Sequence, residues 1–564
     1  MIFSPLKDYE QTLKSAHAAH TKARFQQLSD QSGVNVEANR ATVQAYNTQK
    51  SGADKEKGRL SRLKTYRVLA VILAVVAFVG AIWGFVYLPL VGVICALVAV
   101  AALVVVFWKL NPIIRNQAQL AQQEDAKAQK LLAEAQAQMA SLNALLQGED
   151  GLSLLEQTMP LLHFDSNFSF AREKDMVEHF DFPAYENADC SVLDTLCGTY
   201  NGNPFLFETF RKFTMGTEVY HGYKTIHWTE HYTDSKGNRR TRTRSQTLHA
   251  TITRPKPFYG TETRLYYGAQ GSPDLIFSRE NRHLENKSDK QVESMVRKGE
   301  EKLQDKEEAA LEKGGSFTAM ANTEFEVLFG ALDRNHETQF RLLFTPLAQT
   351  NMVDLIRSKT GYGDDFDFFK RKRMNTIVSE HDQNRALRLQ TASLPSYSYD
   401  IAMENFQRVN EEYFRSIFFD FAPLLAIPVY QEAPVHSMEP PSFNSPHYSL
   451  REYEVLANAM DAKSLSHPQT KTPSILKTRH TDTTGSTDCV SVTAHSFDAL
   501  PRVELVPMLG GDGRMHTVSV PWQEYLPLEA TCRMTVGESR QEQSGAIGDA
   551  AKHHLFACAF DAEY

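Results

Sequence analysis

The chain has 564 residues, with 60 basic and 68 acidic side chains and a formal net charge of −8 at pH 7. This charge excludes a general electrostatic attraction to nucleic acid or to anionic lipid, so any such contact has to be local. We therefore predict no nucleic-acid partner. Six cysteines without a CxxC pair indicate reduced thiols in a cytosolic compartment, and the length leaves room for two or three soluble units.

Residues 1–66 are polar and rich in Ala, Gln, Lys and Glu, with apolar side chains at a loosely helical spacing. Three glycines, Gly33, Gly52 and Gly58, interrupt this pattern. We predict an N-terminal cytoplasmic arm of one or two amphipathic helices. Because the polar stretch precedes the first apolar run, we expect no cleaved secretory signal.

The next stretch, residues 67–110, has no charged side chain between Val68 and Trp108. A helix rises about 1.5 Å per residue and about 20 apolar residues cross a bilayer, so this run is long enough for two crossings. A break at Tyr87-Leu88-Pro89 predicts one helix over residues 68–87 and a second over 90–108. The result is a transmembrane helical hairpin. The alternative, a buried hairpin in a soluble protein, calls for a polar face that this run lacks.

Basic side chains flank the apolar run on both sides. They are Lys55, Lys57, Arg59, Arg62, Lys64 and Arg67 at its entrance, and Lys109 and Arg115 beyond its exit. Such residues stay on the cytoplasmic side of a membrane. We therefore predict two transmembrane helices in the cell membrane, both termini in the cytoplasm, and the lipid bilayer as a partner.

Residues 111–148 predict a helical or coiled-coil stalk, because small and apolar side chains repeat with alternating steps of four and three. The seam comprises Ile114, Ala118, Ala121, Asp125, Ala128, Leu132, Ala135, Met139, Leu142 and Leu146. This seam has two possible packing partners. It packs either on the N-terminal arm of the same chain or on another copy, which would give a homo-oligomer.

Residues 149–435 change to short alternating apolar runs broken by turns, which predict an α+β, β-rich cytoplasmic domain. Its clearest feature is a β-hairpin made of Glu218–Thr233 and Arg239–Arg254. Pro255 and Pro257 follow directly, and we expect them to end the second strand.

Further along this domain, Ser288–Lys313 predicts a highly charged helix that ends at Gly314-Gly315. Residues 318–344 predict two strands around a polar turn. Thr345, an N-cap hydroxyl followed by proline, predicts the start of a helix. The expected order is strand, turn, strand, helix.

The apolar run Ile417–Tyr430 predicts a buried strand interrupted by Pro423 and Pro428. Residues 436–564 then predict a Pro-rich linker and a small β-rich C-terminal unit. Its strand-like pieces are Cys489–Ser496, Val503–Pro507 and His516–Trp522, with a turn at Gly510-Gly511-Asp512-Gly513.

Two segments carry a resemblance to a known family: HATITRPKPFYG (249–260) and NTEFEVLFGALDRNHETQFRLLFTPLAQTNMVDLI (322–356). Together with the paired membrane helices, they resemble a family of bacterial membrane proteins, the domain of unknown function numbered thirty-one thirty-seven. The charged helix at 288–313 looks like an insertion relative to this family. The resemblance implies a two-helix membrane hairpin with a β-rich cytoplasmic domain in the bacterial inner membrane, and it implies no catalytic residue.

One metal-site motif occurs: His227-Trp228-Thr229-Glu230-His231 spells H-x-x-E-H, the pattern of inverted zinc peptidases. That chemistry needs a helix, on which both histidines bind zinc while the glutamate activates water. Here the surrounding residues favour a strand, on which Glu230 points away from His227 and His231. His249 on the facing strand is a further candidate ligand, and the alternative is a solvated histidine cluster.

A row of arginines, Arg240, Arg242 and Arg244, shares one face of the predicted strand. Such a row suits phosphate, including a lipid headgroup. The alternative is a soluble strand edge whose charge Glu218 or Glu230 balances.

A second basic run, Lys370-Arg371-Lys372-Arg373, follows three aspartates that offset its charge, and we interpret it as plain surface.

No phosphate-binding loop, serine nucleophile elbow, H-E-x-x-H helix or dinucleotide fingerprint occurs, so we expect no cofactor and assign no catalytic residue. The leading hypothesis is a membrane-anchored binding or scaffold protein facing the cytoplasm, with protein partners or a second copy reached through the stalk. The alternative is a membrane-anchored metal-dependent hydrolase that uses His227, Glu230 and His231.

Overall fold

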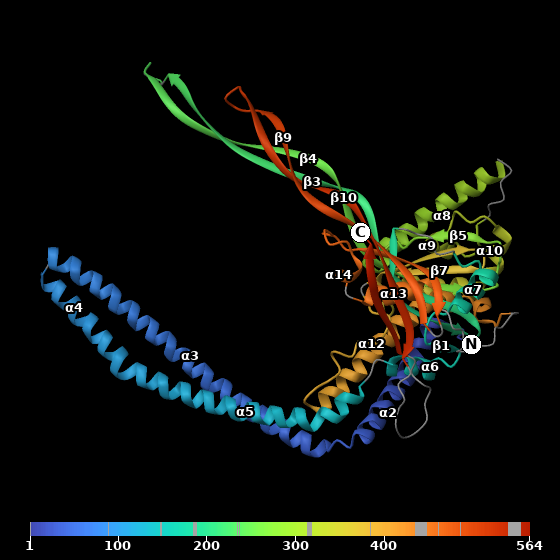
Figure 1. Cartoon of the computed structure of the whole chain (residues 1–564), viewed down its shortest axis with the longest axis horizontal. Coiled ribbons are helices and arrows are strands. Elements are labelled where there is room, and N and C mark those ends of the chain that lie inside the picture. The colour runs from blue at the N-terminus through green and yellow to red at the C-terminus, as the bar shows by residue number, and fades with distance from the viewer. Residues whose placement is uncertain are drawn as a thin grey trace. The chain divides into compact units, whose positions relative to one another are not determined.

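The computed structural model of the chain is α+β, with long helices and two antiparallel sheets (Figure 1). This confirms the α+β class predicted from the sequence. The chain divides into two compact units: a helical unit of residues 16–154 and 389–413, and a sheet unit of residues 1–15, 155–388 and 414–564. The structure describes residues 2–87, 89–146, 149–183, 189–233, 235, 237–312, 319–383, 385–434, 448–460, 462–484, 487–539 and 554–563.

Long helices form the helical unit. They are α2 (Lys14–Ser32), α3 (Val36–Tyr87), α4 (Pro89–Val104), a π-helical turn (Val105–Leu110), α5 (Asn111–Leu145) and the first part of α6 (Glu149–Thr158). Gly33 follows the end of α2 with a left-handed φ of 64°, a conformation that glycine adopts without strain. Gly52 and Gly58 lie inside α3, so the interruptions predicted there are wrong. A single glycine lowers helix stability by only about 1 kcal/mol, which a long helix absorbs.

Within the helical unit, α3 and α5 lie side by side and antiparallel (Figure 1). α5 buries one side chain every seven residues, namely Ile114, Ala121, Ala128, Ala135 and Leu142, and it also buries Met139. Lys57 Nζ lies 2.6 Å from Asp125 Oδ1, and Gln138 Nε2 donates to Thr42 Oγ1 over 3.1 Å. In this structure α5 packs on α3 of the same chain.

Two helical stretches, Val36–Trp83 and Leu90–Leu145, are long and apolar enough to cross a membrane. Only 11% and 17% of their most apolar windows are buried within the structure. Trp83 and Leu97, for example, are each about two thirds exposed, at 67% and 66%. A core helix of a soluble protein would instead bury these side chains.

Residues 389–413, which include the first half of α12 (Tyr399–Leu425), complete the helical unit. Asn39 joins them to α3, because its Oδ1 accepts from the backbone N–H of Tyr399 over 2.9 Å and its Nδ2 donates to the carbonyl of Tyr397 over 3.0 Å. Phe25 of α2 packs its ring against Tyr399.

The larger sheet of the sheet unit has seven antiparallel strands in the order β1-β2-β3-β4-β7-β6-β5. Their bounds are β1 (Leu162–Phe164), β2 (Cys190–Tyr200), β3 (Asn203–Thr233), β4 (Arg239–Gly268), β5 (Ile276–Arg279), β6 (Phe366–Arg371) and β7 (Met374–Ser379). The hairpin predicted from the alternation in residues 218–254 is confirmed as the distal part of β3 and β4.

Successive side chains on each strand point to opposite faces of this sheet. On the face that we call outer, Leu206 and Tyr266 pack against α7 (Phe170–Phe180). On the inner face, Phe207 packs against Phe421 of α12, with ring centroids 5.6 Å apart. Helices therefore cover both sides of the sheet over its first strands.

The prolines that were expected to stop β4 do not stop it. β4 continues through Pro255 and Pro257, which pair in register with Thr217 and Met215 of β3. β4 is bonded to β7 only over Leu265–Gly268, so around the prolines its other edge carries no partner strand among the described residues. Proline is tolerated at such an edge because its missing N–H is not needed there.

The helices α9 (Thr323–Phe329) and α10 (Glu337–Leu343) occupy the segment for which two strands were predicted, so that prediction is wrong. Their caps explain the outcome. The side chain of Asn322 accepts from the N–H of Phe325 over 3.0 Å, and Gly330 ends α9 with a φ of 72°. Short apolar runs do not distinguish helix from strand, and here the capping residues decide.

The neighbouring predictions are confirmed. α11 (Pro346–Arg357) begins as expected, with the hydroxyl of Thr345 accepting from the N–H of Ala348. The charged helix is α8 (Asp289–Glu312). Its expected end at Gly314-Gly315 lies outside the described residues.

The segment 417–430, predicted as a buried strand, is instead the end of α12 followed by a 3-10 turn, Pro428–Gln431. Its burial was predicted correctly, since Ile417, Phe421 and Ile427 are fully buried. A helix that is surrounded by protein loses its polar face, and its sequence then resembles that of a buried strand.

The smaller sheet has four antiparallel strands in the order β11-β10-β9-β8. They are β8 (Ile475–Thr484), β9 (Thr487–Leu509), β10 (Met515–Ser539) and β11 (His554–Glu563). The three predicted strand pieces are confirmed as parts of β9 and β10, and the predicted glycine turn is confirmed between these strands. The Pro-rich residues 435–447 lie outside the described part of the chain.

A buried helix, α13 (Leu450–Ala459), ties the two sheets together. The carboxylate of Glu454 accepts from the N–H of Val192 on β2 over 2.9 Å, while the hydroxyl of Tyr453 donates to Asp488 on β9 over 2.6 Å. The sheets therefore share polar contacts that solvent does not reach. A short helix, α14 (Ala462–Leu465), follows.

Candidate functional site

Two long β-ribbons extend from the sheets and lie along each other (Figure 1). The first ribbon consists of residues 213–233 of β3 and 239–259 of β4, which pair only with each other over most of this length. The second ribbon consists of residues 497–509 of β9 and 515–527 of β10. Two-stranded ribbons are weak alone, so each depends on the other for stability.

The ribbons pack through one face of each. The shared core comprises Ile226, Leu248 and Ala250 from the first ribbon and Val518 and Val520 from the second. Their backbones approach closely at Gly222, where a Cβ atom would lie 2.4 Å from the carbonyl oxygen of Ser519. Lys224 Nζ donates to the carbonyl of Thr517 over 3.0 Å, and the N–H of Gly511 donates to Gln246 Oε1 over 2.7 Å.

The predicted arginine row lies near the tip of the first ribbon. Glu230 Oε2 accepts from Arg244 Nε over 2.7 Å and from Arg242 over 3.0 Å, so one carboxylate serves two guanidiniums. Arg242 also lies 5.7 Å from the ring centre of Tyr232. These side chains are about half exposed, and such surface pairs contribute less than about 1 kcal/mol each. The row is thus partly neutralised, in the way that the alternative interpretation describes.

The predicted zinc ligands lie on the first ribbon as a strand and not as a helix. His227 and His231 share the face that points away from the ribbon core, and Glu230 points to the opposite face. His249 is instead hydrogen-bonded to His221, with 2.9 Å between Nδ1 of His221 and Nε2 of His249. Over the described ranges, no group of three or more histidines, cysteines or acidic residues is arranged to hold a metal ion.

A surface that the sequence analysis did not identify lies on the outer face of the second ribbon. Val503, Leu505, Leu509 and Met515 are 62%, 63%, 65% and 63% exposed. The remaining residues on this face between Val503 and Pro521 are Pro507, Thr517, Ser519 and Pro521. We call these eight residues the apolar strip. None of them carries a charge. In the sequence of residues 502–509, apolar side chains stand both at the odd positions and at Val506 and Met508, and this pattern could have indicated a strand with two apolar faces.

A buried charge network lies elsewhere in the sheet unit, around His381. Its Nδ1 contacts Asp365 Oδ2 at 2.5 Å and its Nε2 lies 3.3 Å from Asp420 Oδ1. Tyr362 stacks on the imidazole with centroids 3.7 Å apart. Burial lowers the pKa of His381, but Asp420 and Asp365 outweigh it and raise the pKa to about 9. The ring is therefore a buried imidazolium held by carboxylates, which gives it no free nitrogen to act as a base.

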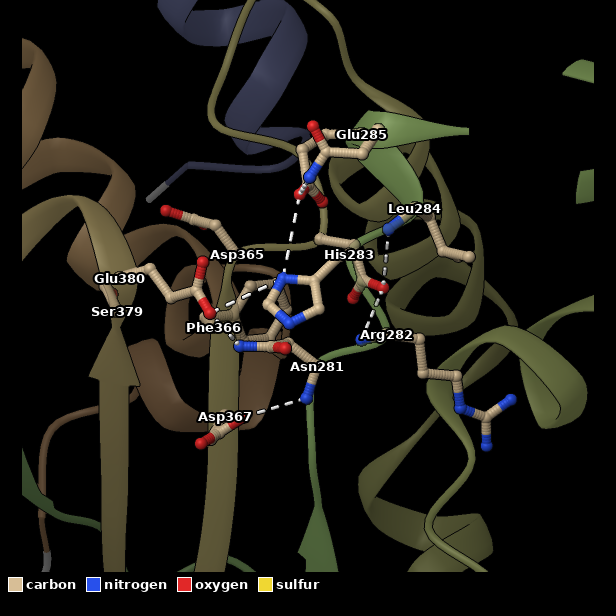
Figure 2. Close-up of polar contacts among 12 residues, drawn as sticks. Asn281, Arg282, His283, Leu284, Glu285, Asp365, Phe366, Asp367, Ser379 and Glu380 are labelled. Atoms are coloured by element: carbon tan, nitrogen blue, oxygen red, sulfur yellow. Dashed lines mark hydrogen bonds and ion pairs between the residues drawn. The ribbon is translucent and has the colours of Figure 1, made fainter. Parts of the chain in front are cut away.

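A second polar cluster closes the loop after β5 (Figure 2). His283, which has a left-handed φ of 52°, points between Glu285 and Glu380, with its Nδ1 3.8 Å and 3.4 Å from their carboxylates. The backbone N–H of Asn281 donates to Asp367 Oδ1 over 2.8 Å. His283 is half exposed, so this cluster fixes a surface loop.

The basic run that was interpreted as plain surface is only partly surface. Lys370 is 1% exposed, and its Nζ donates to the carbonyls of Gly271 and Lys372 over 3.0 Å and 2.6 Å. Burial lowers the pKa of Lys370 to about 7, with Asp181 opposing the shift. Alternation on β6 turns this residue to the inner face, while Arg371 faces outward.

No family model, curated protein or solved structure matches this chain. The function therefore has to be argued from the arrangement of its own residues.

Proposed function

We propose that the chain is a membrane-anchored binding protein of the bacterial inner membrane, which presents the apolar strip of its second ribbon to a protein partner. The observation that carries this proposal is a charge-free exposed face on a ribbon whose other face is fixed by packing on the first ribbon. Monomeric proteins rarely expose large contiguous apolar patches without a partner.

The anchor in this proposal is the pair of apolar helices at residues 68–87 and 90–108. Basic residues flank both ends, which favours a hairpin with both termini in the cytoplasm. The same topology is what the resemblance to the family of unknown function implies. An anchored domain meets other membrane proteins at a raised effective concentration, so a weak contact through the strip suffices for binding.

The chemistry of the strip favours a protein over a lipid surface as its occupant. Its turn carries Asp512 and Arg514, two charges that resist insertion into hydrocarbon. Pro507 and Pro521 interrupt its strand edges, which disfavours addition of a further strand. The partner is therefore a protein with its own apolar face, bound side chain against side chain.

Photo-crosslinking in intact cells tests the partner. A photoreactive amino acid at Leu505 is expected to yield one discrete protein adduct, whereas the same group at Leu342, which is 68% exposed on α10, is expected to yield none. Introducing Val503→Asp and Leu509→Asp should remove the adduct, because buried unpaired carboxylates oppose apolar contact. Equal labelling at both positions, or an adduct that survives the aspartates, would contradict the proposal.

Reporter fusions test the anchor. Green fluorescent protein should fluoresce when fused after Arg115, and alkaline phosphatase should be active only when fused at Leu88. Replacing Arg59, Arg62, Lys64 and Arg67 by Gln should weaken this orientation, because the basic flank holds it. Active phosphatase after Arg115 would contradict the hairpin.

A further inference from the structure

Within the described residues, helices cover the outer face of the seven-stranded sheet over β2 to β4 and reach Met374 of β7, and a groove lies over the rest of β7 and β6. α7 and α13 pack on the covered part, where Arg451 of α13 ion-pairs with Glu208 of β3. Past the loop at Asp181, the side chains of β4, β7 and β6 line a groove of about 510 Å³. This volume is in the range of pockets that bind small molecules.

The floor of the groove is mainly apolar. Four apolar side chains from three adjacent strands line it: Phe369 and Val378 are partly exposed, whereas Tyr266 and Met374 are buried where they meet α7. Thr376 lies in their midst, directly opposite Tyr266 and Phe369 in the strand register. An aromatic or aliphatic body would lie flat on such a floor and gain by its burial.

The charged side chains around the groove differ in whether they form ion pairs. Asp181 has two cations, Lys372 at 3.6 Å and Arg373 at 3.5 Å. Glu262 also has two, Lys212 and Arg264.

Arg371 differs from these groups. It is exposed at the groove on the outer face of β6, and the structure shows neither an ion pair nor a hydrogen bond between its guanidinium and any residue within the described ranges. The charged side chains that line the groove are Asp181, Glu262, Asp367, Arg264 and Arg371. Cations from outside the lining pair with Asp181 and Glu262. Arg371 is therefore the lining cation that is available to receive an anion.

We infer that this groove binds a small organic acid, with its carboxylate on Arg371 and its apolar body on the floor. A guanidinium matches the two oxygens of a carboxylate with two parallel hydrogen bonds. A doubly charged phosphate fits less well, because the carboxylates of Asp367 and Glu262 share the same groove. The ligand is therefore a monocarboxylate with an aromatic or aliphatic body. This site is independent of the ribbon surface and of its partner.

Equilibrium dialysis with a matched pair of probes tests the inference. The full chain in lipid nanodiscs is titrated with 2-naphthoate and with its neutral analogue 2-naphthamide, and empty nanodiscs correct for partition into lipid. One equivalent of naphthoate is expected to bind, roughly 10-fold or more tightly than the amide, as for a hydrogen bond to a charged group. Binding of neither probe at millimolar concentration, or equal binding of both, would overturn the inference.

Variants assign the site. Arg371→Gln should weaken naphthoate about 10-fold and abolish the preference over naphthamide. Arg297→Gln, which removes an exposed arginine from α8, should leave both affinities unchanged. Thr376→Trp should block both probes by filling the floor, and circular dichroism verifies that each variant is folded. Retained discrimination in Arg371→Gln, or unaltered binding in a folded Thr376→Trp variant, would place the probe elsewhere and overturn the inference.

Discussion

Gly222→Ala is expected to loosen the two ribbons and to lower the stability of their contact by about 1–3 kcal/mol, the range for overpacking a close interface. The added Cβ would lie 2.4 Å from the carbonyl oxygen of Ser519 and 3.0 Å from its carbonyl carbon. Both atoms belong to the backbone of β10, so rotation of a side chain cannot relieve the overlap. The ribbons have to separate here, and Ile226 and Leu248 lose their packing on Val518.

Gly260→Ala is the matched control. Gly260 also lies on a long strand, β4, but a Cβ there would meet no atom within 4 Å. Its effect is expected to stay within about 0.5 kcal/mol.

Amide hydrogen exchange on the full chain measures the difference locally. Residues 215–252 and 503–525 should exchange roughly 5- to 100-fold faster in Gly222→Ala than in wild type. Similar exchange in both glycine variants would show that the ribbons do not depend on this contact.

Local patterns in the sequence were enough to predict the elements that have a regular apolar spacing or a clear helix start. The first ribbon follows from period-two alternation in residues 218–254, and α11 follows from the Thr345-Pro346 start. The failures occur where an apolar run is short or is buried on nearly every side. α9 and the end of α12 bury almost all of their side chains, and α10 has only seven residues, so their sequences fit a strand as well as a helix.

The surfaces were harder to predict because they depend on which elements pack together. The arginine row was visible in the sequence, but its neutralisation by Glu230 depends on strand register. Lys370 and Arg371 are adjacent in a basic run, yet one is buried and the other lies in the groove. Alternation separates them only once β6 is known to be a strand with both faces defined.

Raising the pH is expected to destabilise the sheet unit through His381. In the folded chain the pKa of His381 is raised from 6.5 to about 9, although burial opposes this, because Asp420 and Asp365 lie against the ring. A group with a raised pKa stabilises the fold fully below its unfolded value, and that contribution is lost as the pH rises through the folded value. For a side chain only 8% exposed, the shift corresponds to on the order of 3 kcal/mol, lost between about pH 6.5 and 9.

The other charged side chains around His381 also decide whether the fold weakens or strengthens as the pH rises. Asp382 and Arg385 complete the network, with Arg385 3.2 Å from Asp420. Burial, reinforced by Asp382, raises the pKa of Asp420 to about 7 against the pull of His381 and Arg385. A carboxyl with a raised pKa also loses stability as it ionises, so both groups predict a fold that weakens with rising pH.

His381→Gln is expected to lower the free energy of unfolding by about 3–5 kcal/mol at pH 6, because it leaves buried carboxylates without their cation. His283→Gln is the matched control, since His283 also lies between two acidic residues but is 52% exposed, and its loss should matter by less than about 1 kcal/mol. Calorimetric unfolding of the full chain from pH 6 to pH 10 measures both. The difference between wild type and His381→Gln should shrink as the pH passes 9, and a constant difference would mean that the folded chain keeps His381 neutral.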